Sequence, residues 1–348
     1  MTPTLDPLTI FPADTVWPVV SASKTSIPMQ IRAWSEARAS LPSSSARLYC
    51  PAVLDGREIR AIAITMLSGG WLCELPTMFE PSDLIWDSEA SLEILAKTLA
   101  RQPHPLCLER VPMDSPSIAA LRHAYAGRGI VLQTAAMPTP KIDLESFQGD
   151  STTFLNAGRR SDFRRAERRA ASFGSVEFEI HAPTTGVELQ RLLGEAYAVN
   201  AASWKAGAGT ALTTDHAQGS FFTHFANSAS ADGIVRIAFM RIDGQAVAMQ
   251  IAVEWQRRFW LLKISYDDAY ARCSPGHLLM RHTLRHAIQT GLLSYELMGI
   301  MDDWTGQWAS ERRRYVRVRA IPFSAAVFKM LARKSVRSIH SRLRQIVR

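Results

Sequence analysis

The sequence predicts an α/β (α+β) protein in which the same succession of strands and helices occurs twice. Segments with alternating apolar residues are interleaved with segments whose apolar residues recur near every 3.6 positions, which indicates strands and helices in turn. Three strands, a helix, a strand, a helix and a further strand follow one another near residues 47–136 and again near 234–321. The chain has 348 residues, of which 47% are hydrophobic and 21% charged, as expected for two folded domains.

The first half begins with a lead-in, residues 1–45, that is rich in Pro, Ser and Thr and has one short helical candidate at 27–40. The predicted elements after it are strands at 47–54, 58–67 and 71–75, a helix at 88–101, a strand at 106–109, a helix at 115–127 and a strand at 130–136. Pro138 and Pro140 follow the last strand. We interpret them as a linker to the second half.

The second half is predicted to carry a longer version of this order. Its elements are a helix at 158–173, a strand at 175–181, helices at 185–202 and 215–229, strands at 234–242, 245–255 and 258–266, a helix from about 275, a strand at 293–298, a short helix at 303–309 and a strand at 315–321. The chain therefore divides into a lead-in (1–45), two α/β domains (46–138 and 139–322) and a C-terminal segment (323–348).

Basic residues are concentrated in two predicted helices. The formal net charge is +8 at pH 7, and residues 312–348 contain twelve Lys or Arg but no Asp or Glu. Residues 323–348 predict a cationic amphipathic helix that docks on the anionic inner leaflet of a membrane, packs on its own domain or remains a basic tail. The helix at 158–173 carries six arginines in two adjacent rows, which either bind a polyanion or form a solvated face.

Other features of the sequence favour a cytoplasmic protein. There is no run of 18 apolar residues, and the first thirty residues lack the basic start and apolar centre of a signal peptide. The four cysteines are scattered and form no C-x-x-C pair, which favours a reducing environment without zinc. We expect a cytoplasmic location with a peripheral contact at the inner membrane through the C-terminal helix.

A helix is expected to begin directly after a strand and a polar loop, at Ser274, Pro275 and Gly276. Ser is a common N-cap, Pro suits the first helical position, and Gly leaves room for an approaching ligand. The free backbone N–H groups and the positive end of the helix dipole at such a start can hold a phosphate. The alternative is an ordinary capped helix that binds no ligand.

Three segments of the second half resemble a known family. The segments NAASWKAGAGTAL (200–212), RIDGQAVAMQ (241–250) and YDDAYARCSPGHLL (266–279) are similar to bacterial GNAT-like acyltransferases of the CelD type. Those proteins are found with cellulose and other exopolysaccharide synthesis and are distant relatives of the FemAB peptidoglycan-bridge transferases. The resemblance covers about residues 140–322. It implies two tandem GNAT-like domains, each a mixed, mostly antiparallel twisted sheet flanked by helices, with 46–138 as the degenerate copy.

The resemblance also implies an acyl donor, acetyl-CoA or another acyl-CoA, and no metal. The pantetheine arm would pair with the strand that ends at Tyr266, and the pyrophosphate would lie at the start of the next helix. The implied donor-binding residues are Lys263, Ser265, Arg272, Ser274, Pro275, Gly276, His277 and Leu278. The sequence departs from the family in two places. Residues 272–275 replace the usual glycine-rich phosphate loop, and Glu296 with residues 302–305 replaces the family's strand aspartate and downstream Tyr-Lys pair.

Acyl transfer from a thioester to an amine needs a base that frees the amine and an acid for the leaving thiolate. We predict Asp267 or Glu296 as the base and Tyr266 as the acid. Asp268, beside Asp267, is a further candidate for the base. The alternatives are a solvated turn for the two aspartates, an arginine partner for Glu296 and a core position for Tyr266.

The acceptor is expected to contact Trp204, Lys205, Asp268 and Asp302. Trp204 would form a wall of its pocket, and Lys205 would hold an anion such as a sugar phosphate or a carboxylate. The alternative is a packed Trp204 beside a Lys205 that extends along the surface. The histidines at 282 and 286 share a helix face but lack the Glu of a metalloprotease motif, so we expect no metal there.

Together these features predict an acyl-CoA-dependent N-acyltransferase of the GNAT superfamily. It would act on an amine or hydroxyl of a saccharide or lipid-linked saccharide precursor in exopolysaccharide or cell-envelope synthesis. The first alternative is an aminoacyl-tRNA-dependent transferase of the FemAB kind. The second is a non-catalytic GNAT-like protein that binds a polyanion. If the chain is the acyl-CoA-dependent enzyme, we do not expect it to bind nucleic acid.

Overall fold

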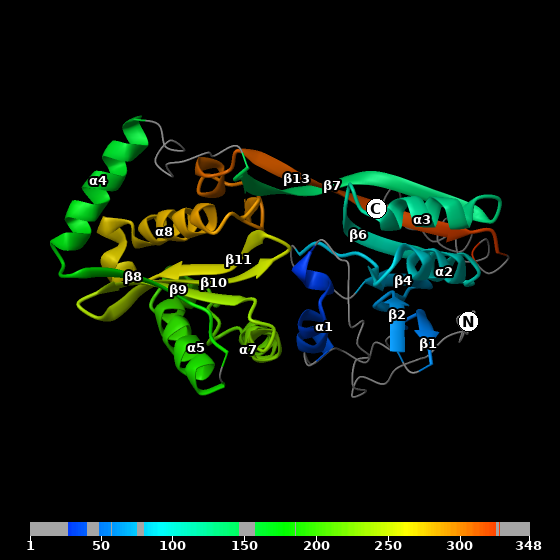
Figure 1. Cartoon of the computed structure of the whole chain (residues 1–348), viewed down its shortest axis with the longest axis horizontal. Coiled ribbons are helices and arrows are strands. Elements are labelled where there is room, and N and C mark those ends of the chain that lie inside the picture. Colours follow the sequence, from blue (N-terminus) through cyan, green and yellow to red (C-terminus); the bar gives the residue numbers. More distant parts are fainter. Residues whose placement is uncertain are drawn as a thin grey trace, which may run out of the picture. The chain divides into compact units, whose positions relative to one another are not determined.

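The computed structural model describes residues 27–39, 49–56, 58–74, 80–145, 157–184, 186–324 and 327. The described residues form two compact units, each with its own core (Figure 1). The first unit comprises the described parts of residues 1–32, 43–137 and 314–348, and the second those of 33–42 and 138–313. The predicted C-terminal amphipathic helix lies outside the described residues, apart from residues 323, 324 and 327.

The first unit contains strands of two sheets and a pair of helices. Its elements are η1 (Pro28–Gln30), β1 (Ala52–Asp55), β2 (Glu58–Ile62), β3 (Thr65–Ser68), β4 (Trp71–Glu74), β5 (Ile85–Trp86), α2 (Glu89–Ala100), β6 (Leu106–Pro112), α3 (Pro116–Tyr125) and parts of β7 (Gly129–Asp143) and β13 (Glu311–Pro322). The small sheet has the order β1-β2-β5, and the larger sheet follows the order β3-β4-β6-β13-β7 here. The side chain of Ser88 caps α2, whose leucines 92, 95 and 99 enter the core as the helical period predicts.

The second unit is built around a central antiparallel meander. Its elements are α1 (Arg32–Ala39), α4 (Ala157–Ala171), β8 (Val176–His181), α5 (Gly186–Ala201), α6 (Trp204–Gly207), α7 (His216–Ser230), β9 (Val235–Ile242), β10 (Gln245–Trp255), β11 (Arg258–Tyr266), η2 (Asp268–Cys273), α8 (Pro275–Gln289), β12 (Ser294–Glu296) and η3 (Thr305–Gln307). The strands follow the order β7-β12-β11-β10-β9-β8. Both units are mixed sheets flanked by helices, which confirms the predicted α/β class.

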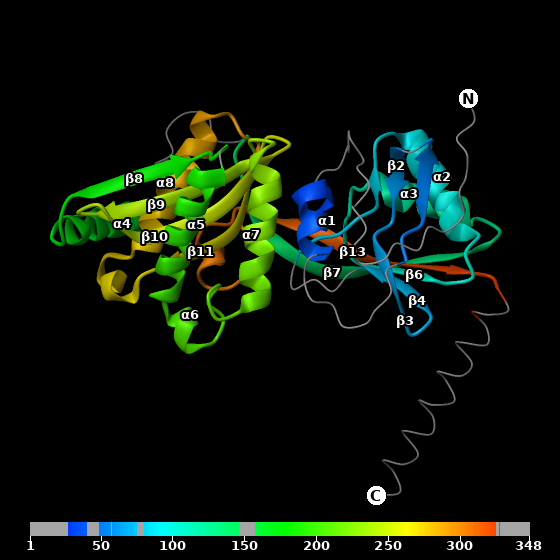
Figure 2. The same cartoon turned by 90° about the horizontal axis from the view of Figure 1, so that it is seen from below.

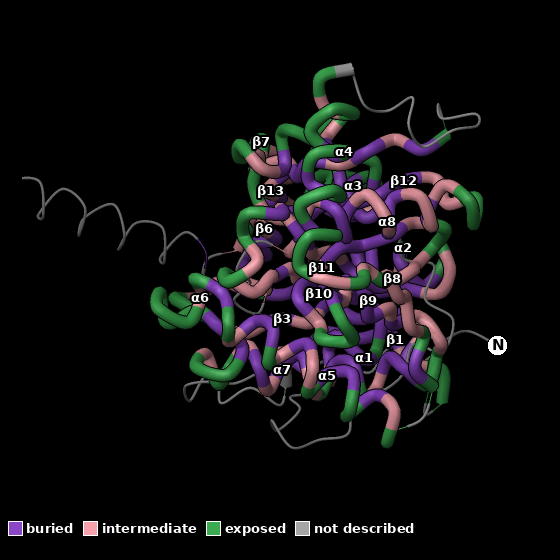
Figure 3. The backbone as a smooth tube through the Cα atoms, turned by 90° about the vertical axis from the view of Figure 1, so that its left-hand side faces the viewer, coloured by how far each residue is buried: buried purple, intermediate pink, exposed green. Residues whose placement is uncertain are grey.

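The core of the second unit lies on both faces of the meander. Helix α8 covers one face of the sheet, and α5 and α7 cover the other (Figures 1 and 2). Residues 247–253 of β10 are consequently buried without interruption, and β9 and β10 are largely purple in Figure 3. A strand covered on both faces has no solvent side, which explains why this segment is apolar apart from Gln250.

Strands β11 and β12 separate in a way that positions the site. They pair in parallel over only three residues of each strand, and Trp260 with Glu296 is the last pair. Beyond that point β11 continues to Tyr266 and remains paired with β10 on its other side. Residues 261–266 therefore form an edge that β12 does not cover, directly before η2 and α8.

Pro138 and Pro140 do not form an irregular linker, because both lie inside β7, but the boundary between the two units falls between residues 137 and 138, where the sequence places it. A proline can occupy a strand where its missing N–H is not needed for pairing. Here the carbonyl of Pro140 accepts a hydrogen bond from the Leu297 N–H at 3.1 Å, so the strand still contributes to the sheet.

Three further elements differ from the predictions. The single strand expected at 58–67 is divided into β2 and β3, which belong to different sheets although no Gly or Pro marks the break. The short helix expected at 303–309 is only the 3₁₀ turn η3. The last strand, β13, begins at Glu311, and its residues from 314 belong to the first unit. The assignment of residues 46–138 as a degenerate GNAT-like domain stays a prediction.

Candidate active site

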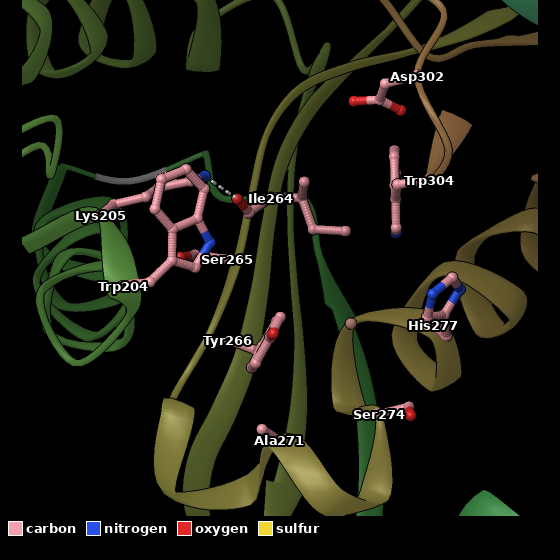
Figure 4. A pocket seen from close by; sticks show the side chains of 11 residues that line it. Trp204, Lys205, Ile264, Ser265, Tyr266, Ala271, Ser274, His277, Asp302 and Trp304 are labelled. Carbon is pink, nitrogen blue, oxygen red and sulfur yellow. Dashed lines mark hydrogen bonds between the residues drawn. The ribbon is translucent and has the colours of Figure 1, made fainter. Parts of the chain in front are cut away.

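A cavity of about 510 Å³ lies in the second unit, beside the uncovered edge of β11 (Figure 4). Its wall is made by the end of β11, the start of α8, the short helix α6 and the turn before η3. The lining residues are Trp204, Lys205, Ile264, Ser265, Tyr266, Ala271, Ser274, Gly276, His277, Asp302 and Trp304. This volume is within the range of small-molecule sites, so the cavity is the candidate active site.

The start of α8 borders this cavity. Ser274 precedes the helix in the left-handed conformation, with φ 52° and ψ 52°, and its side chain makes no capping hydrogen bond. The N-cap role expected for this hydroxyl is therefore wrong, although the carbonyl of Ser274 accepts from the N–H of His277 and of Leu278. Pro275 occupies the first helical position, as predicted. Gly276 lies so close to β11 that a Cβ there would be 3.3 Å from Cδ1 of Tyr266.

Four of the predicted donor-binding residues line the cavity and four do not. Ser265, Ser274, Gly276 and His277 are part of the wall. Pro275 and Leu278 are buried in the helix start, Arg272 is exposed on η2, and Lys263 points to α7, where it donates to Oε1 of Gln218. These four side chains are therefore not part of the cavity wall.

The Trp204-Lys205 pair lies on α6, whose first turn is capped by Ser203. Trp204 is 60% exposed, so it is not the packed tryptophan of the alternative interpretation. Lys205 Nζ donates a hydrogen bond to the carbonyl oxygen of Ile264 at 2.5 Å, which ties α6 to the edge of β11. Burial, and next the charge of Lys263, lower the pKa of Lys205 to about 8.

Among the described residues that line the cavity, Asp302 is the one with an acidic side chain. Its Oδ1 accepts hydrogen bonds from the backbone N–H of Thr305 at 2.7 Å and from the Thr305 hydroxyl at 2.9 Å. Asp267 instead caps η2 by accepting from the N–H of Ala269 at 2.9 Å. Asp268 is exposed on η2, and neither of these two aspartates lines the cavity.

Glu296 lies outside the cavity, in a buried ion pair. Its side chain is 0% exposed and accepts from Nη2 of Arg313 at 2.6 Å and from Nε at 3.1 Å. The Ser294 hydroxyl donates to the same carboxylate at 2.7 Å, and Cζ of Arg313 lies 5.4 Å from the ring centre of Trp260. This arrangement corresponds to the arginine-partner alternative and fixes the point where β11 and β12 separate.

His277 separates the main cavity from a smaller one of about 200 Å³. The small cavity is lined by Ser274, His277 and residues of α4 and η3, namely Arg159, Asp162, Phe163, Ala166 and Gln307. The imidazole stacks on Trp308 with ring centres 5.8 Å apart. Burial first, and then the charge of Arg159, lower the pKa of His277, so its ring is neutral at neutral pH.

The sequence did not predict Trp304, Ile264 or Ala271 as part of the wall, nor the approach of α4 to the helix start. The aromatic character of the segment DDWTGQW was the one signal that pointed to Trp304. The approach of α4 depends on three apolar residues, Phe163, Ala166 and Ala170, which pack into the core among many arginines.

Other reactive residues of this unit have structural partners. Nε2 of His286 lies 2.8 Å from Glu254, and the ring of His282 stacks on Phe178. Cys273 is buried, and burial raises the pKa of its thiol. Within the described ranges, no group of three His, Cys, Asp or Glu is arranged to hold a metal ion. None of the helices in those ranges combines the length and hydropathy needed to span a bilayer.

Comparison with known proteins identifies the fold of this region. Residues 157–306 match the family model described as an acetyltransferase (GNAT) domain. No curated protein matches the chain in sequence. This segment is thus similar in sequence to a GNAT acetyltransferase domain.

Solved structures similar to most of the chain include three of low sequence identity. A conserved protein of unknown function from Bacteroides thetaiotaomicron has a TM-score of 0.54 at 11% identity, over 90% of this chain and 99% of that one. FemX has a TM-score of 0.51 at 10% identity, over 87% and 94%. The C-terminal DUF2156 domain of a protein described as a lysylphosphatidylglycerol synthetase from Agrobacterium fabrum has 0.50 at 12%, over 78% and 83%. At such identities the likeness concerns the fold alone.

Proposed function

We propose that the second unit transfers an acyl group from acyl-CoA to an amine or hydroxyl of a saccharide precursor, as the resemblance to the CelD type implies. One observation carries this proposal. The cavity brings together the predicted donor residues Ser274, Gly276 and His277 with the predicted acceptor residues Lys205 and Asp302. These residues come from separate segments of the sequence, and a shared cavity is what a two-substrate reaction requires.

The donor is assigned to the side of the cavity formed by β11 and α8. The uncovered edge at residues 261–266 offers backbone groups to the amides of the pantetheine arm. The pyrophosphate is assigned to the start of α8, where the positive end of the helix dipole favours an anion. The close approach of Gly276 to Tyr266 leaves no room for a large side chain between the two elements.

The chemistry follows from the groups that remain in the cavity. A lone pair of the acceptor nitrogen or oxygen forms a bond to the thioester carbon, the carbon–sulfur bond then breaks, and the CoA thiolate takes a proton. We assign proton removal from the acceptor to Asp302, because its carboxylate lines the cavity, whereas Asp267 and Glu296 are not part of that lining. Tyr266 lines the same cavity and is assigned as the proton donor to the thiolate.

An aminoacyl-tRNA-dependent transfer is the second candidate. Arginines 160, 164, 165, 168 and 169 are all on the exposed side of α4, which is a charge pattern suited to a polyanion. The similar fold of FemX is compatible with this candidate. If the exposed arginines bind a polyanion and the cavity binds no donor, the chain is instead a non-catalytic polyanion-binding protein.

Calorimetric titration of the full chain with acetyl-CoA tests the donor. We expect saturable binding of acetyl-CoA at one site per chain. The affinity for acetyl-CoA should depend less on salt concentration than an affinity for transfer RNA would. A chain that binds aminoacyl-tRNA but no acyl-CoA would replace the leading proposal by the second candidate. Salt-sensitive binding of any nucleic acid without either donor activity would favour the non-catalytic protein.

Substitution of Trp204 separates the acceptor side from the donor side. We expect Trp204→Ala to raise the KM for the acceptor by about tenfold, because an aromatic contact contributes on the order of 1 kcal/mol. The Kd for acetyl-CoA should be unchanged, since Trp204 lies on α6, across the cavity from the start of α8 (Figure 4). Trp204→Phe is the matched control and should retain most of the acceptor binding. A loss of donor binding in Trp204→Ala would contradict the division of the cavity.

A further inference from the structure

The ammonium group of Lys205 has no negatively charged partner within the part of the chain that the structure describes. Among the described residues, it donates a hydrogen bond to a neutral acceptor, the Ile264 carbonyl, and forms no ion pair with a carboxylate. The charged group that acts on it is another cation, Lys263. Placing a half-buried cation without a counter-ion is unfavourable, so the site favours a ligand that supplies negative charge.

The segment that carries Lys205 is held in place by its own hydrogen bonds. The Asn200 side chain accepts from the Leu212 N–H at 2.7 Å, which closes the loop on both sides of α6. The Ser203 hydroxyl accepts from the N–H of Lys205, and the Lys205 carbonyl accepts from the Thr210 N–H at 2.9 Å. The cation is therefore positioned by the backbone and does not depend on a flexible loop.

Ser265 gives a second, independent indication of a ligand. It is 4% exposed, lines the same cavity, and its Oγ has no hydrogen-bond partner among the residues that the structure describes. A buried hydroxyl without a partner costs free energy that a bound acceptor atom would recover. Ser265 directly follows Ile264, whose carbonyl accepts the hydrogen bond from Lys205, and in Figure 4 it lies on the side of the cavity away from His277.

We propose that Lys205 and Ser265 form a subsite for an anionic group, a phosphate or a carboxylate, carried by the acceptor. The inference deepens the proposed function and rests on it for the identity of the acceptor. It narrows the acceptor class to a saccharide that bears an acidic group, such as a sugar phosphate or a uronic acid. The reacting amine or hydroxyl would then point to Asp302, which lies across the cavity from Lys205 (Figure 4).

The phosphates of the donor do not account for this subsite. They are assigned to the start of α8, where Ser274 and His277 form the other side of the cavity. Lys205 instead contacts the Ile264 carbonyl, on the strand edge assigned to the pantetheine arm, whose amides carry no charge. A second anion is thus needed to neutralise Lys205, and the acceptor is the remaining substrate.

Lysine NMR on the full chain tests the subsite without any activity assay. The chain contains only seven lysines, so the Cε resonances of ¹³Cε-labelled lysine can be resolved, and Lys205→Arg identifies that of Lys205. The pKa of Lys205 is measured with inorganic phosphate, with acetate and with chloride at matched ionic strength. An anion bound to the ammonium stabilises its charged form, so the pKa should rise from about 8 by about one unit or more.

The comparison of anions identifies the acidic group, and the other lysines serve as controls. A larger rise with phosphate indicates a phosphorylated acceptor, and a larger rise with acetate indicates a carboxylate. Lys97, in an exposed pair with Glu93, should respond equally to all three salts. If Lys205 also responds equally to all three, the subsite is absent. Because acetyl-CoA binding is measured separately, a chain that binds the anion but no acyl-CoA refutes the proposed function and leaves the subsite intact.

The positive charge of Lys205 should make acceptor binding depend on pH. Lys263, Tyr266, His277 and Asp302 are the titratable groups on the strand and around the cavity that face Lys205. The anion binds the protonated amine, so its affinity should be full below the pKa of Lys205 and fall as the pH rises through about 8. Lys205→Arg, which stays charged, should move this loss to higher pH.

Discussion

Glu296→Ala is expected to lower the free energy of unfolding by about 3–5 kcal/mol, because it removes the fully buried carboxylate of the ion pair with Arg313, whose side chain is only 11% exposed. The carboxylate is 0% exposed, and it makes two hydrogen bonds with Arg313 and accepts one from Ser294. It also occupies the last paired position of β12, opposite Trp260. Denaturant unfolding followed by tryptophan fluorescence measures the effect, since Trp260 lies under Arg313.

A surface ion pair supplies the matched control for this substitution. Glu311 lies 2.9 Å from Lys141 and its side chain is 53% exposed, so Glu311→Ala should cost less than about 1 kcal/mol. The double variant Glu296→Ala/Arg313→Met should recover much of the lost stability, because it replaces both charges of the pair by apolar side chains. Equal stability of Glu296→Ala and the wild type would refute the structural role. Loss of turnover in Glu296→Gln with unchanged stability would restore Glu296 as the catalytic base.

The central meander shows how far local sequence signals determine this fold. Strands β9, β10 and β11 lie within one residue of their predicted bounds. The first turn has positive φ at both Asp243 and Gly244, which is the conformation that this pair favours in a hairpin. The second turn adopts positive φ at Gln256 and Arg257, where nothing in the residue types requires it. The position of this second turn was predicted from the strongly apolar strands on either side of it and not from the turn residues themselves.

Predictions failed where pairing across the sheet overrides local preference. Pro138 and Pro140 read as a linker because proline cannot donate a hydrogen bond, yet the strand needs only the carbonyl of Pro140 at that edge. The run at 58–67 has no breaker, and its division into β2 and β3 follows from distant partners, β1 for the first part and β4 for the second. Such partners are not visible in the local pattern.

The site shows the same division between local and distant information. The motif residues Trp204, Lys205, Ser274 and Gly276 line the cavity, because the motif and the helix start are local features that the strand order brings together. Glu296 was a candidate base from its place at a strand end. Its partner Arg313 is 17 residues away, on β13, and only the paired strands show that the two side chains meet.

Gly276→Trp is expected to weaken acetyl-CoA binding by about 100-fold or more, which corresponds to about 2.7 kcal/mol. Even a Cβ at this position would be 3.3 Å from Tyr266, so an indole has to extend into the cavity where the donor is assigned. Gly276 has no unusual backbone angle, and therefore the effect arises from occupied space rather than from strain. Calorimetry on the full chain measures the Kd for acetyl-CoA.

Two variants separate this effect from a general effect of the substitution. In Gly276→Ala the Tyr266 ring needs to move by only a few tenths of an ångström, so binding should weaken slightly. Gly194→Trp on α5 places the same side chain in open space and should leave both binding and stability unchanged. A thermal unfolding midpoint near that of the wild type shows that Gly276→Trp remains folded. If that folded variant binds acetyl-CoA as tightly as the wild type, the donor does not lie at the start of α8, because its space would then be filled by the indole.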